Sequence, residues 1–368
     1  MIKVGINGFG RIGRLAYRIG LLKHSQEVNF TAVNTSGSMD TAGWAHLLNY
    51  DSTYRKFEYE VKAKELKPAK EATDEDSQIG EISVSERGVV TAVLAQRDPA
   101  KISWSKFGVD VVIESTGHFT DAEGAKKHAL GGAKRVVISA PAKGENVGTY
   151  ILGVNETDKT ALVISNASCT TNCVAPVAAV MQSAFGIEKA MMTTVHSYTD
   201  DQNLQDGSHT DLRRARGAAV NIVPTTTGAA VAATETIPSL KGIFDGMALR
   251  VPTATGSLTD FTFLLSKNVT KDEVNKAFSD AVNNPIYKGI LAVSEGYLVS
   301  SDIIGRSESA IVDLPLTQVV AGNMVKVFAW YDNEWGYANR LVEQVIRVGN
   351  ALSGNSVPTD PLTLTHNG

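Results

Sequence analysis

Cysteine is scarce in this chain of 368 residues, which contains only Cys169 and Cys173. Two thiols cannot form the disulfide framework of a small secreted domain, so we expect a reducing compartment. The two cysteines are four residues apart, with no second pair and no histidine nearby at ligand spacing. This arrangement argues against a zinc site, and we expect no bound metal.

Long hydrophobic runs are also missing. The longest apolar candidate, around residues 174–181, is about eight residues long, whereas a membrane-spanning helix needs about 18. Residues 1–5, MIKVG, already have the pattern of a strand, which leaves no room for a signal peptide. We therefore expect a cytoplasmic protein that does not bind membranes.

The chain has no excess of positive charge. Lysine and arginine number 35 against 39 aspartate and glutamate residues, which gives a net charge of −4. A chain with this balance has no strong positive field to attract nucleic acid, so we expect no nucleic-acid partner. Otherwise the composition is that of an ordinary globular protein, and its length predicts two domains.

Short apolar segments alternate with helix-like segments in the first half of the chain. This order predicts βαβ units and a doubly wound parallel sheet in an α/β fold. We expect strands at 2–6, 28–33, 109–114 and 135–139 and helices at 11–22 and 123–130. A charged stretch over residues 62–88 interrupts the pattern and is either a wholly solvated excursion or one with short antiparallel strands.

The pattern changes after residue 173. Long strands are expected at 191–195, 247–251, 260–266 and 324–331, with helices at 271–281 and 337–351. This order predicts a second domain of the α+β type, with a mostly antiparallel sheet. We place the first domain at residues 1–168, joined by the C-terminal helix 334–351, the second domain at 169–333, and a tail at 352–368.

A glycine-rich turn, GFGRIG at residues 8–13, lies between the first expected strand and the first expected helix. Gly8 permits a tight turn, Gly10 lets a pyrophosphate approach the backbone, and Gly13 allows close packing of the helix on the strand. The helix N-terminus adds the positive end of its dipole. Although such turns also serve plain packing, this context predicts a Rossmann dinucleotide-binding domain.

The second strand ends without a carboxylate, because Asn34, Thr35 and Ser36 occupy its end and Asp40 lies several residues beyond. An acidic residue there binds the ribose of NAD and repels a 2′-phosphate. Neutral hydrogen-bond donors make NADP acceptable as well. These residues could alternatively serve only to form a turn.

The segment SNASCTTNC, residues 165–173, follows an apolar strand at 161–164 and precedes an apolar helix-like stretch. Helix amides and the helix dipole stabilise a thiolate, so we expect a lowered pKa for Cys169. Cys173, one turn further on the apolar side, is expected to pack in the core. His196 ends the strand 191–195 and is the candidate base, although a lone histidine can also be structural.

Groups suited to phosphate binding occur at residues 213–216, at residues 224–228 and at Arg250. Arginine grips an oxyanion with two donors, and Thr–Gly turns present amide and hydroxyl donors. Each of these groups alone would be interpreted as a turn or a solvated charge.

Together these segments resemble a phosphorylating glyceraldehyde-3-phosphate dehydrogenase over residues 1–350. The matching stretches are GINGFGRIGR (5–14), NYDSTY (49–54), RDP (97–99), ESTGHF (114–119), SAPAK (139–143), SNASCTTNC (165–173), TTVHSYT (193–199), DLRRARGAA (211–219), PTTTGAA (224–230), MALRVPT (247–253) and WYDNEWGY (330–337).

The resemblance implies oxidation of glyceraldehyde 3-phosphate to 1,3-bisphosphoglycerate through a cysteine thioester, with NAD or NADP as acceptor, in a homotetramer. It implies that Cys169 is the nucleophile and His196 the base. The implied ligands of the substrate phosphate are Thr199 and Arg250, and those of inorganic phosphate are Ser168, Thr170, Arg214, Thr227 and Gly228. The implied cofactor residues are Gly8, Gly10, Arg11, Ile12, Gly13, Asn34, Thr35, Arg97, Thr116, Phe119, Ser139, Asn333 and Tyr337.

Two departures from the family bear on the cofactor. Thr35 stands where many NAD-linked members resemble one another in having aspartate, and Gly207 and Ser208 stand in a loop that commonly carries Leu-Pro. In the family this loop reaches the adenosine ribose of a neighbouring subunit, so both changes leave space for a 2′-phosphate. We predict dual or NADP-preferring specificity, and Gly207 and Ser208 join the candidate cofactor residues.

Two other functions are compatible with parts of the sequence. An erythrose-4-phosphate dehydrogenase shares the cysteine and histidine chemistry but mostly hydrolyses its thioester. A non-catalytic NAD(P)-binding scaffold would have kept only the fold. The retained phosphate residues argue against the first alternative, and the retained nucleophile and base argue against the second.

Overall fold

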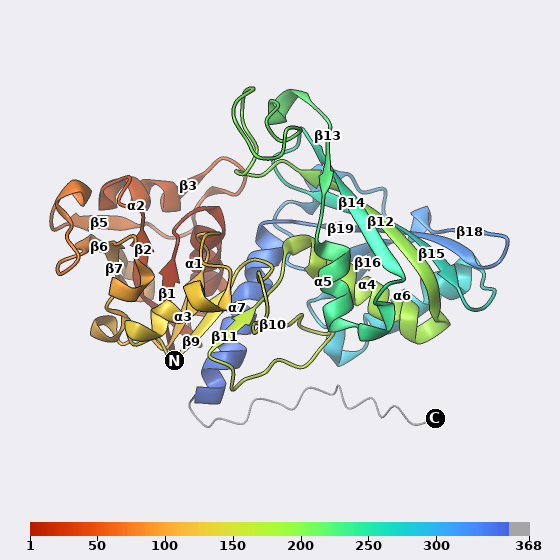
Figure 1. Cartoon of the computed structure of the whole chain (residues 1–368), viewed down its shortest axis with the longest axis horizontal. Helices are drawn as coiled ribbons and strands as arrows, with labels where there is room; N and C mark the ends of the chain where they lie inside the picture. Colours follow the sequence, from red (N-terminus) through yellow and green to blue (C-terminus); the bar gives the residue numbers. More distant parts are fainter. Residues whose placement is uncertain (353–368) are drawn as a thin grey trace. The chain divides into compact units, whose positions relative to one another are not determined.

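The computed structural model describes residues 1–352 and divides them into two compact units (Figure 1). The first unit contains residues 1–150, 157–167 and 338–352, and the second contains 151–156 and 168–337. Of the predicted tail, residues 353–368 lie outside the described part of the chain.

The first unit is built on a nine-stranded sheet, counted over residues 1–352, in the order β10-β11-β9-β8-β1-β2-β7-β6-β5. In this order, every neighbouring pair between β10 and β7 is parallel. The two remaining pairs, β7–β6 and β6–β5, are antiparallel. The strands are β1 (Ile2–Asn7), β2 (Val28–Thr35), β5 (Lys62–Glu65), β6 (Gln78–Val84), β7 (Val89–Ala95), β8 (Val111–Glu114), β9 (Arg135–Ile138), β10 (Gly148–Thr149) and β11 (Val163–Ser165).

The chain leaves β1 toward β2 and β7 on one side and returns to β8 and β9 on the other side. This order confirms the doubly wound parallel sheet and places its switch point between β1 and β8, where α/β sheets bind ligands. The helices of this unit are α1 (Arg11–Lys23), α2 (Thr41–Asn49), α3 (Ala122–Leu130) and residues 338–352 of α7 (Trp335–Leu352). A short hairpin of β3 (Tyr50–Asp51) and β4 (Arg55–Lys56) follows α2.

The charged stretch 62–88 contains two antiparallel strands, β5 and β6, that extend the sheet beyond β7. Ile79, Ile82 and Val84 of β6 are buried, so the interpretation as a wholly solvated excursion is wrong. The Glu65 carboxylate accepts hydrogen bonds from two backbone N–H groups in the first turn of α2. The excursion therefore caps a helix that has no side-chain cap from its own N-cap residue.

The second unit contains an eight-stranded sheet, again counted within residues 1–352, in the order β13-β14-β12-β15-β19-β17-β16, with β18 also paired to β19. Its pairs are antiparallel except β12–β14 and β16–β17, which confirms the mostly antiparallel prediction. The strands are β12 (Ile187–Ser197), β13 (Val223–Thr226), β14 (Phe244–Val251), β15 (Ser257–Leu265), β16 (Leu291–Ser294), β17 (Ala310–Asp313), β18 (Gln318–Val320) and β19 (Met324–Tyr331).

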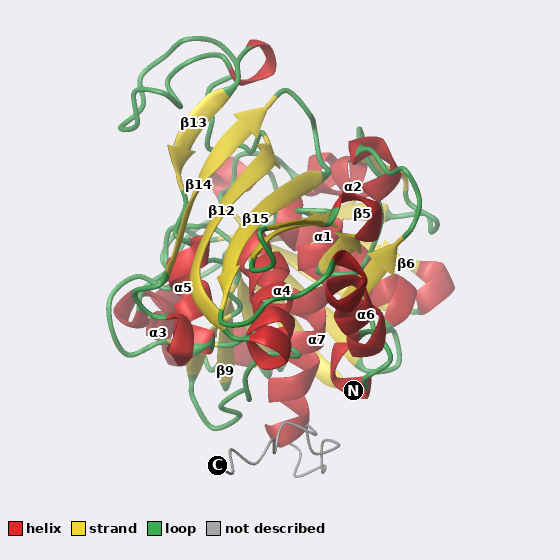
Figure 2. Ribbon diagram, turned by 90° about the vertical axis from the view of Figure 1, so that its right-hand side faces the viewer, coloured by secondary structure: helices red, strands yellow, loops and turns green. Residues whose placement is uncertain are grey.

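Three helices pack against this sheet, α4 (Cys169–Phe185), α5 (Ala229–Thr236) and α6 (Lys271–Ala281) (Figure 2). Met192 of β12 is 2% exposed, whereas its neighbour Met191 is 66% exposed. Because alternate residues of a strand face opposite sides of the sheet, one side is covered and the other is open. None of the helices within residues 1–352 is long and apolar enough to cross a membrane.

Candidate active site

The glycine-rich turn forms a cradle for an anion at the carboxyl end of β1. Gly8 has φ of +95°, and a Cβ there would lie 2.7 Å from backbone atoms of Ser115 and Thr116. A Cβ at Gly13 would lie 2.3 Å from the Gly8 carbonyl oxygen. A Cβ at Gly10 would meet no atom of residues 1–352 within 4 Å. Gly10 is the N-cap of α1 and has no side-chain cap, so the cradle fits a pyrophosphate.

Arg11 and Ile12 follow in the first turn of α1. The Arg11 guanidinium donates to both carboxylate oxygens of Asp51, at 3.1 and 3.4 Å. Asp51 also accepts hydrogen bonds from two backbone N–H groups. Partial burial acts to raise the pKa of its carboxyl, but these hydrogen bonds and the Arg11 charge together keep it low. The Arg11 side chain thus contacts Asp51, and its backbone N–H remains in the cradle.

Asn34 and Thr35 of β2 have buried side chains whose donors are used by the protein. The Asn34 amide donates to Asn7 Oδ1 and to the Gln96 carbonyl, each at 2.7 Å. The Thr35 hydroxyl donates to the Leu94 carbonyl at 2.9 Å. The prediction that both side chains offer donors to a cofactor is therefore wrong, since the Asn7 side chain and two backbone carbonyls already accept these hydrogen bonds. Ser36 is exposed, and its hydroxyl donates to the exposed Ser38 hydroxyl at 3.0 Å.

The other predicted cofactor residues of the first unit follow strands of the same sheet. Arg97 comes after β7 and is exposed, Thr116 and Phe119 come after β8, and Ser139 comes after β9. Because these strands are parallel, all four residues lie at the carboxyl edge of the sheet, as the cradle does.

Cys169 is the first residue of α4, and Ser168 is its N-cap. The Ser168 hydroxyl accepts a hydrogen bond from the Thr171 N–H at 3.0 Å, which satisfies one of the free donors of the helix end. Cys169 Sγ lies 3.4 Å from His196 Nε2. The structure thus brings together the predicted nucleophile and the predicted base.

The tautomer of His196 follows from its second contact. Its Nδ1 lies 2.6 Å from the Ser197 carbonyl oxygen, which can only accept. Nδ1 must therefore carry the proton, and Nε2 presents its lone pair to Cys169. Burial, together with the Arg250 charge, lowers the pKa of His196 to about 3, so the imidazole is neutral at physiological pH.

Burial raises the pKa of the Cys169 thiol, and the Arg250 charge and hydrogen bonds from Thr170 offset this in part. The prediction of a lowered pKa from the helix N-terminus is therefore wrong for the substrate-free site, because desolvation of the thiolate is the larger effect. Cys173 is fully buried as predicted, and burial strongly raises the pKa of its thiol.

Tyr331, at the end of β19, is a site residue that the sequence interpretation did not single out. Its hydroxyl lies 2.9 Å from Thr170 Oγ1 and 2.8 Å from Thr194 Oγ1, and its ring meets the His196 ring edge to face. Burial raises the pKa of its phenol, so it stays protonated. Its position inside the segment WYDNEWGY was the available signal.

Arg250, which contacts Thr199, forms the first of two cationic groups whose charges act on His196. Arg250 lies opposite His196 in the β12–β14 pairing, and its Nη1 donates to Thr199 Oγ1 at 2.6 Å. Its Nε is buried and has no partner within residues 1–352. This guanidinium therefore keeps a donor for an anion.

Arg214 forms the second cationic group. Its Nε donates to Thr225 Oγ1 at 3.0 Å, and it makes an ion pair with Asp201. Asp201 also accepts from the Thr199 hydroxyl, so one carboxylate joins the two predicted phosphate ligands. Partial burial acts to raise the pKa of Asp201, but the hydrogen bond from Thr199 and the Arg250 and Arg214 charges together keep it low. Asp201 is the second site residue that the sequence interpretation missed.

Thr227 and Gly228 lead into α5. The Thr227 hydroxyl accepts from the Ala229 N–H at 3.2 Å, and Gly228 is the N-cap with no side-chain cap. A Cβ at Gly228 would meet no atom of residues 1–352 within 4 Å. Arg214 Nη2 lies 3.5 Å from the carbonyl of Thr226, so these residues adjoin the second cationic group.

Asn333 and Tyr337 belong to the segment after β19. Asn333 Oδ1 accepts from the Thr255 hydroxyl, the Gly256 N–H and the Ser257 hydroxyl at 3.0–3.2 Å. These three donors fix the amide with its NH₂ group turned away from them. Tyr337 is buried in the first turn of α7.

Gly207 and Ser208 lie in an exposed loop between β12 and β13. Gly207 N–H donates to the Ala215 carbonyl at 2.9 Å, and Asp206 pairs with Arg216 at 2.7 Å. The loop is therefore fixed to the arginine-rich segment that follows it.

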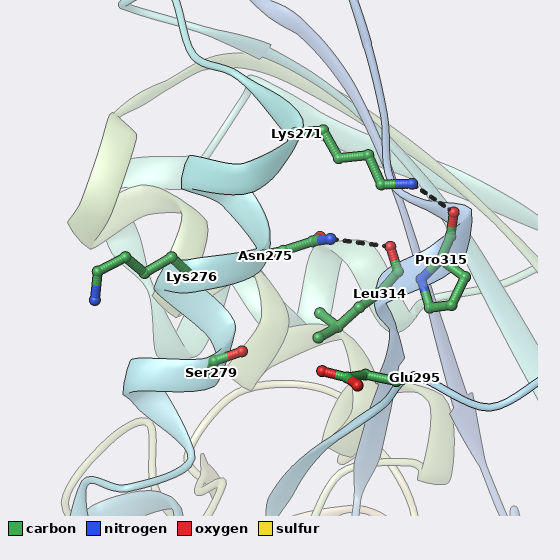
Figure 3. A pocket seen from close by; sticks show the side chains of 7 residues that line it. All are labelled: Lys271, Asn275, Lys276, Ser279, Glu295, Leu314 and Pro315. Carbon is green, nitrogen blue, oxygen red and sulfur yellow. Dashed lines mark hydrogen bonds between the residues drawn. The ribbon is translucent and has the colours of Figure 1, made fainter.

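A separate cavity of about 320 Å³ lies between α6 and the residues around 295 and 314–315 (Figure 3). Lys271 Nζ and Asn275 Nδ2 bridge it to the carbonyls of Pro315 and Leu314. None of the predicted site residues lines it. No cluster of three potential metal ligands occurs among residues 1–352.

Comparisons with known proteins give the same grouping as these motifs. Residues 2–122 match the family described as "Glyceraldehyde 3-phosphate dehydrogenase, NAD binding domain", and residues 168–333 match "Glyceraldehyde 3-phosphate dehydrogenase, C-terminal domain". The chain is 51% identical over 355 residues to glyceraldehyde-3-phosphate dehydrogenase of Streptomyces coelicolor, covering 95% of this chain and 99% of that relative.

Two further relatives are similarly close over the whole chain. Glyceraldehyde-3-phosphate dehydrogenase of Mycobacterium bovis is 48% identical, covering 95% of this chain and 99% of its own length. The chloroplastic glyceraldehyde-3-phosphate dehydrogenase GAPB of Arabidopsis thaliana is 47% identical, covering 96% of this chain and 76% of its own length. This chain therefore belongs to the glyceraldehyde-3-phosphate dehydrogenase family.

Proposed function

We propose that this protein oxidises and phosphorylates glyceraldehyde 3-phosphate to 1,3-bisphosphoglycerate, reversibly, with Cys169 as the nucleophile and His196 as the base. The observation that carries the proposal is the 3.4 Å contact between Cys169 Sγ and a His196 Nε2 whose lone pair faces the thiol. A nucleophile within hydrogen-bond reach of an oriented base is the arrangement that covalent catalysis requires.

The first chemical step is attack on the aldehyde. His196 Nε2 takes the thiol proton while Cys169 Sγ forms a bond to the carbonyl carbon, and His196 then gives this proton to the carbonyl oxygen, which completes the hemithioacetal. Transfer of the proton within the pair removes the need for a free thiolate, which burial disfavours. Arg250 and Thr199 hold the phosphate that the substrate already carries.

The bound nicotinamide supplies the hydride acceptor for oxidation to the thioester. His196 Nε2 takes the hydroxyl proton of the hemithioacetal at this stage, because Nε2 is unprotonated again after the first step. Asn333, whose amide oxygen is saturated by three donors, can present only its NH₂ group to a carboxamide.

Inorganic phosphate then attacks the thioester carbon and gives up its own proton to solvent, and Cys169 Sγ leaves as His196 Nε2 returns the proton that regenerates the thiol. Arg214, Thr227, Gly228 and Ser168 are the proposed ligands of this phosphate, together with Thr170. The Tyr331 hydroxyl lies 2.9 Å from Thr170 Oγ1 and 2.8 Å from Thr194 Oγ1, which holds the Thr170 hydroxyl in place next to Cys169. Tyr331 therefore acts as a positioning residue for Thr170.

In this proposal the two units have separate roles. The first unit binds the cofactor, and the second carries Cys169 and His196. The cradle at Gly8, Gly10 and Gly13 holds the pyrophosphate at the N-terminus of α1. We propose that the protein accepts NADP as well as NAD, because it has Thr35 and no carboxylate at the end of β2, so that no negative charge there repels a 2′-phosphate. The Ser36 hydroxyl donates to Ser38 Oγ, and because this contact is exposed, a ligand can replace it; Gly207 and Ser208 of a second copy are the other candidates.

We further propose a cytoplasmic homotetramer. Large apolar side chains are exposed in the loop before β13 and on the open face of the sheet: Leu204 (78%), Leu212 (82%), Val220 (81%) and Met191 (66%). Exposed apolar groups of this size on several elements are typical of surfaces between subunits. Light scattering after size-exclusion chromatography tests the proposal, and a monomer would contradict it.

Activity measured with and without phosphate tests the proposed reaction. The proposal predicts NAD(P)H formation from glyceraldehyde 3-phosphate that continues only when phosphate or arsenate is present. Continued product formation at full rate without either anion would contradict it and would indicate a hydrolytic aldehyde dehydrogenase.

A further inference from the structure

A chain of buried polar side chains runs beneath the loop that follows β8. It consists of Trp104, His128 of α3, and Glu114 at the end of β8, which are between 0% and 1% exposed. Trp104 Nε1 lies 3.0 Å from His128 Nδ1, and His128 Nε2 lies 2.9 Å from Glu114 Oε2. None of these three side chains has a part in the mechanism proposed above.

The direction of the hydrogen bonds in this chain is fixed. An indole N–H can only donate, so His128 Nδ1 must accept from Trp104. The imidazole proton is therefore on Nε2, which donates to the Glu114 carboxylate. A histidine with both ring nitrogens used in this way cannot rotate or change tautomer without leaving a buried polar group unpaired.

The Glu114 carboxylate connects this chain to both loops at the switch point. Its Oε2 also accepts from Asn7 Nδ2 at 2.6 Å, just before the glycine-rich turn. Its Oε1 accepts from the backbone N–H and the hydroxyl of Thr116, the former at 2.8 Å. Four donors thus converge on one buried carboxylate, two of them from Thr116, a predicted cofactor residue.

The loop after β8 is shaped by these contacts. Thr116 Oγ1, held by Glu114, accepts from the His118 N–H at 3.1 Å, and the Ser115 hydroxyl donates to the Gly8 carbonyl at 2.7 Å. Because Ser115 and Thr116 abut Gly8, a shift of Glu114 would move the loop and the glycine-rich turn together.

We propose that Trp104, His128 and Glu114 are positioning residues that hold the loop 115–119 in its cofactor-binding shape. The affinity for NAD(P) then depends on a histidine that does not touch the cofactor. This inference rests on the proposed function, and it adds residues to which neither the family resemblance nor the mechanism assigned a role.

Equilibrium binding of NAD and of NADP to the purified full chain tests the proposal, because it does not depend on activity. His128→Leu removes the donor to Glu114 and the acceptor for Trp104, and we expect both dissociation constants to rise about tenfold or more. His128→Gln keeps one donor and one acceptor and should restore most of the affinity. The kcat at saturating cofactor and the alkylation rate of Cys169 should stay within about twofold of wild type.

Tyr17→Phe is the matched control. It removes a fully buried side-chain hydrogen bond, to Thr91 at 2.8 Å, in the same unit, and it keeps the ring that packs against Phe9 of the glycine-rich turn. It should lower the melting temperature without changing either dissociation constant. If His128→Leu does not fold, Trp104→Phe removes the indole donor to His128 Nδ1 and leaves the His128 bond to Glu114 in place, and a smaller rise of both dissociation constants is expected.

The proposal is overturned if the His128 or Trp104 variant loses stability as Tyr17→Phe does while binding both cofactors as wild type does. It is also overturned if kcat falls while the dissociation constants stay unchanged. Wild-type protein that binds neither NAD nor NADP would instead overturn the proposed function, so the two failures are distinguishable.

Discussion

His196 Nε2 lies 3.4 Å from Cys169 Sγ, although the two residues belong to different elements, α4 and β12. The helix N-cap at Ser168 fixes the position of the cysteine, and the Ser197 carbonyl fixes the tautomer of the histidine. The contact therefore depends on two local hydrogen bonds that orient the partners before any substrate arrives.

Replacement of His196 by asparagine should lower kcat by about 10²- to 10⁴-fold, the usual contribution of a general base. The alkylation rate of Cys169 at neutral pH should fall as well, since no group remains to take the thiol proton. Iodoacetamide labelling followed by peptide mass spectrometry measures that rate residue by residue. An alkylation rate equal to that of wild type would show that His196 does not activate the thiol.

The stability of the protein should fall on mild acidification because of His196. Its pKa is about 3 in the folded chain against 6.5 in the unfolded chain, so at pH 5 the unfolded state binds the extra proton. The contribution of His196 to the free energy of unfolding is fully present well above pH 6.5 and is about 2 kcal/mol smaller at pH 5. Urea midpoints of wild type and His196→Asn measure the difference, which should shrink in the variant. Parallel curves for the two proteins would be inconsistent with a buried neutral imidazole.

The two cationic groups should affect different Michaelis constants. Arg250→Lys loses the bidentate geometry near Thr199, so the KM for glyceraldehyde 3-phosphate should rise about tenfold or more. Arg214→Lys should raise the KM for inorganic phosphate by a similar factor. Steady-state kinetics with each substrate varied in turn separates them. Exchange of the two effects would mean that the phosphate sites are assigned the wrong way round.

Thr35→Asp should lower kcat/KM for NADP at least about tenfold more than for NAD, because a carboxylate repels a 2′-phosphate. The variant also loses the donor to the Leu94 carbonyl, so some loss of stability is expected with either cofactor. Ser36→Ala tests the exposed donor and should weaken NADP use without this loss of stability. An unchanged NADP kcat/KM in Thr35→Asp would place the 2′-phosphate elsewhere.

The sequence predicted helices and strands best where the residues that determine them are close together in the chain. The helix 271–281 agrees with α6, whose Thr270 and Glu273 form a capping box. Contacts between distant segments had no such signal. Tyr331 reaches Thr170 across 161 positions of sequence, and Asp201 bridges two predicted phosphate ligands from within an exposed loop.

The errors concern burial rather than the choice of residues. The pKa of Cys169 was predicted from the helix end alone, and desolvation reversed its direction. Asn34 and Thr35 were interpreted as free donors because the sequence does not show which hydrogen-bond acceptors lie beside them in the fold. In both cases packing around a correctly placed side chain determined what that side chain can do.

A single-turnover experiment without phosphate tests the central claim most directly. Wild-type protein mixed with NAD(P) and glyceraldehyde 3-phosphate should form a burst of NAD(P)H stoichiometric with active sites and then stop, with the 3-phosphoglyceroyl group on the Cys169 peptide. Addition of phosphate should release the acyl group and restart turnover, and Cys169→Ser should show neither burst nor adduct. Continuous turnover without phosphate, or an acyl group on Cys173, would contradict the account.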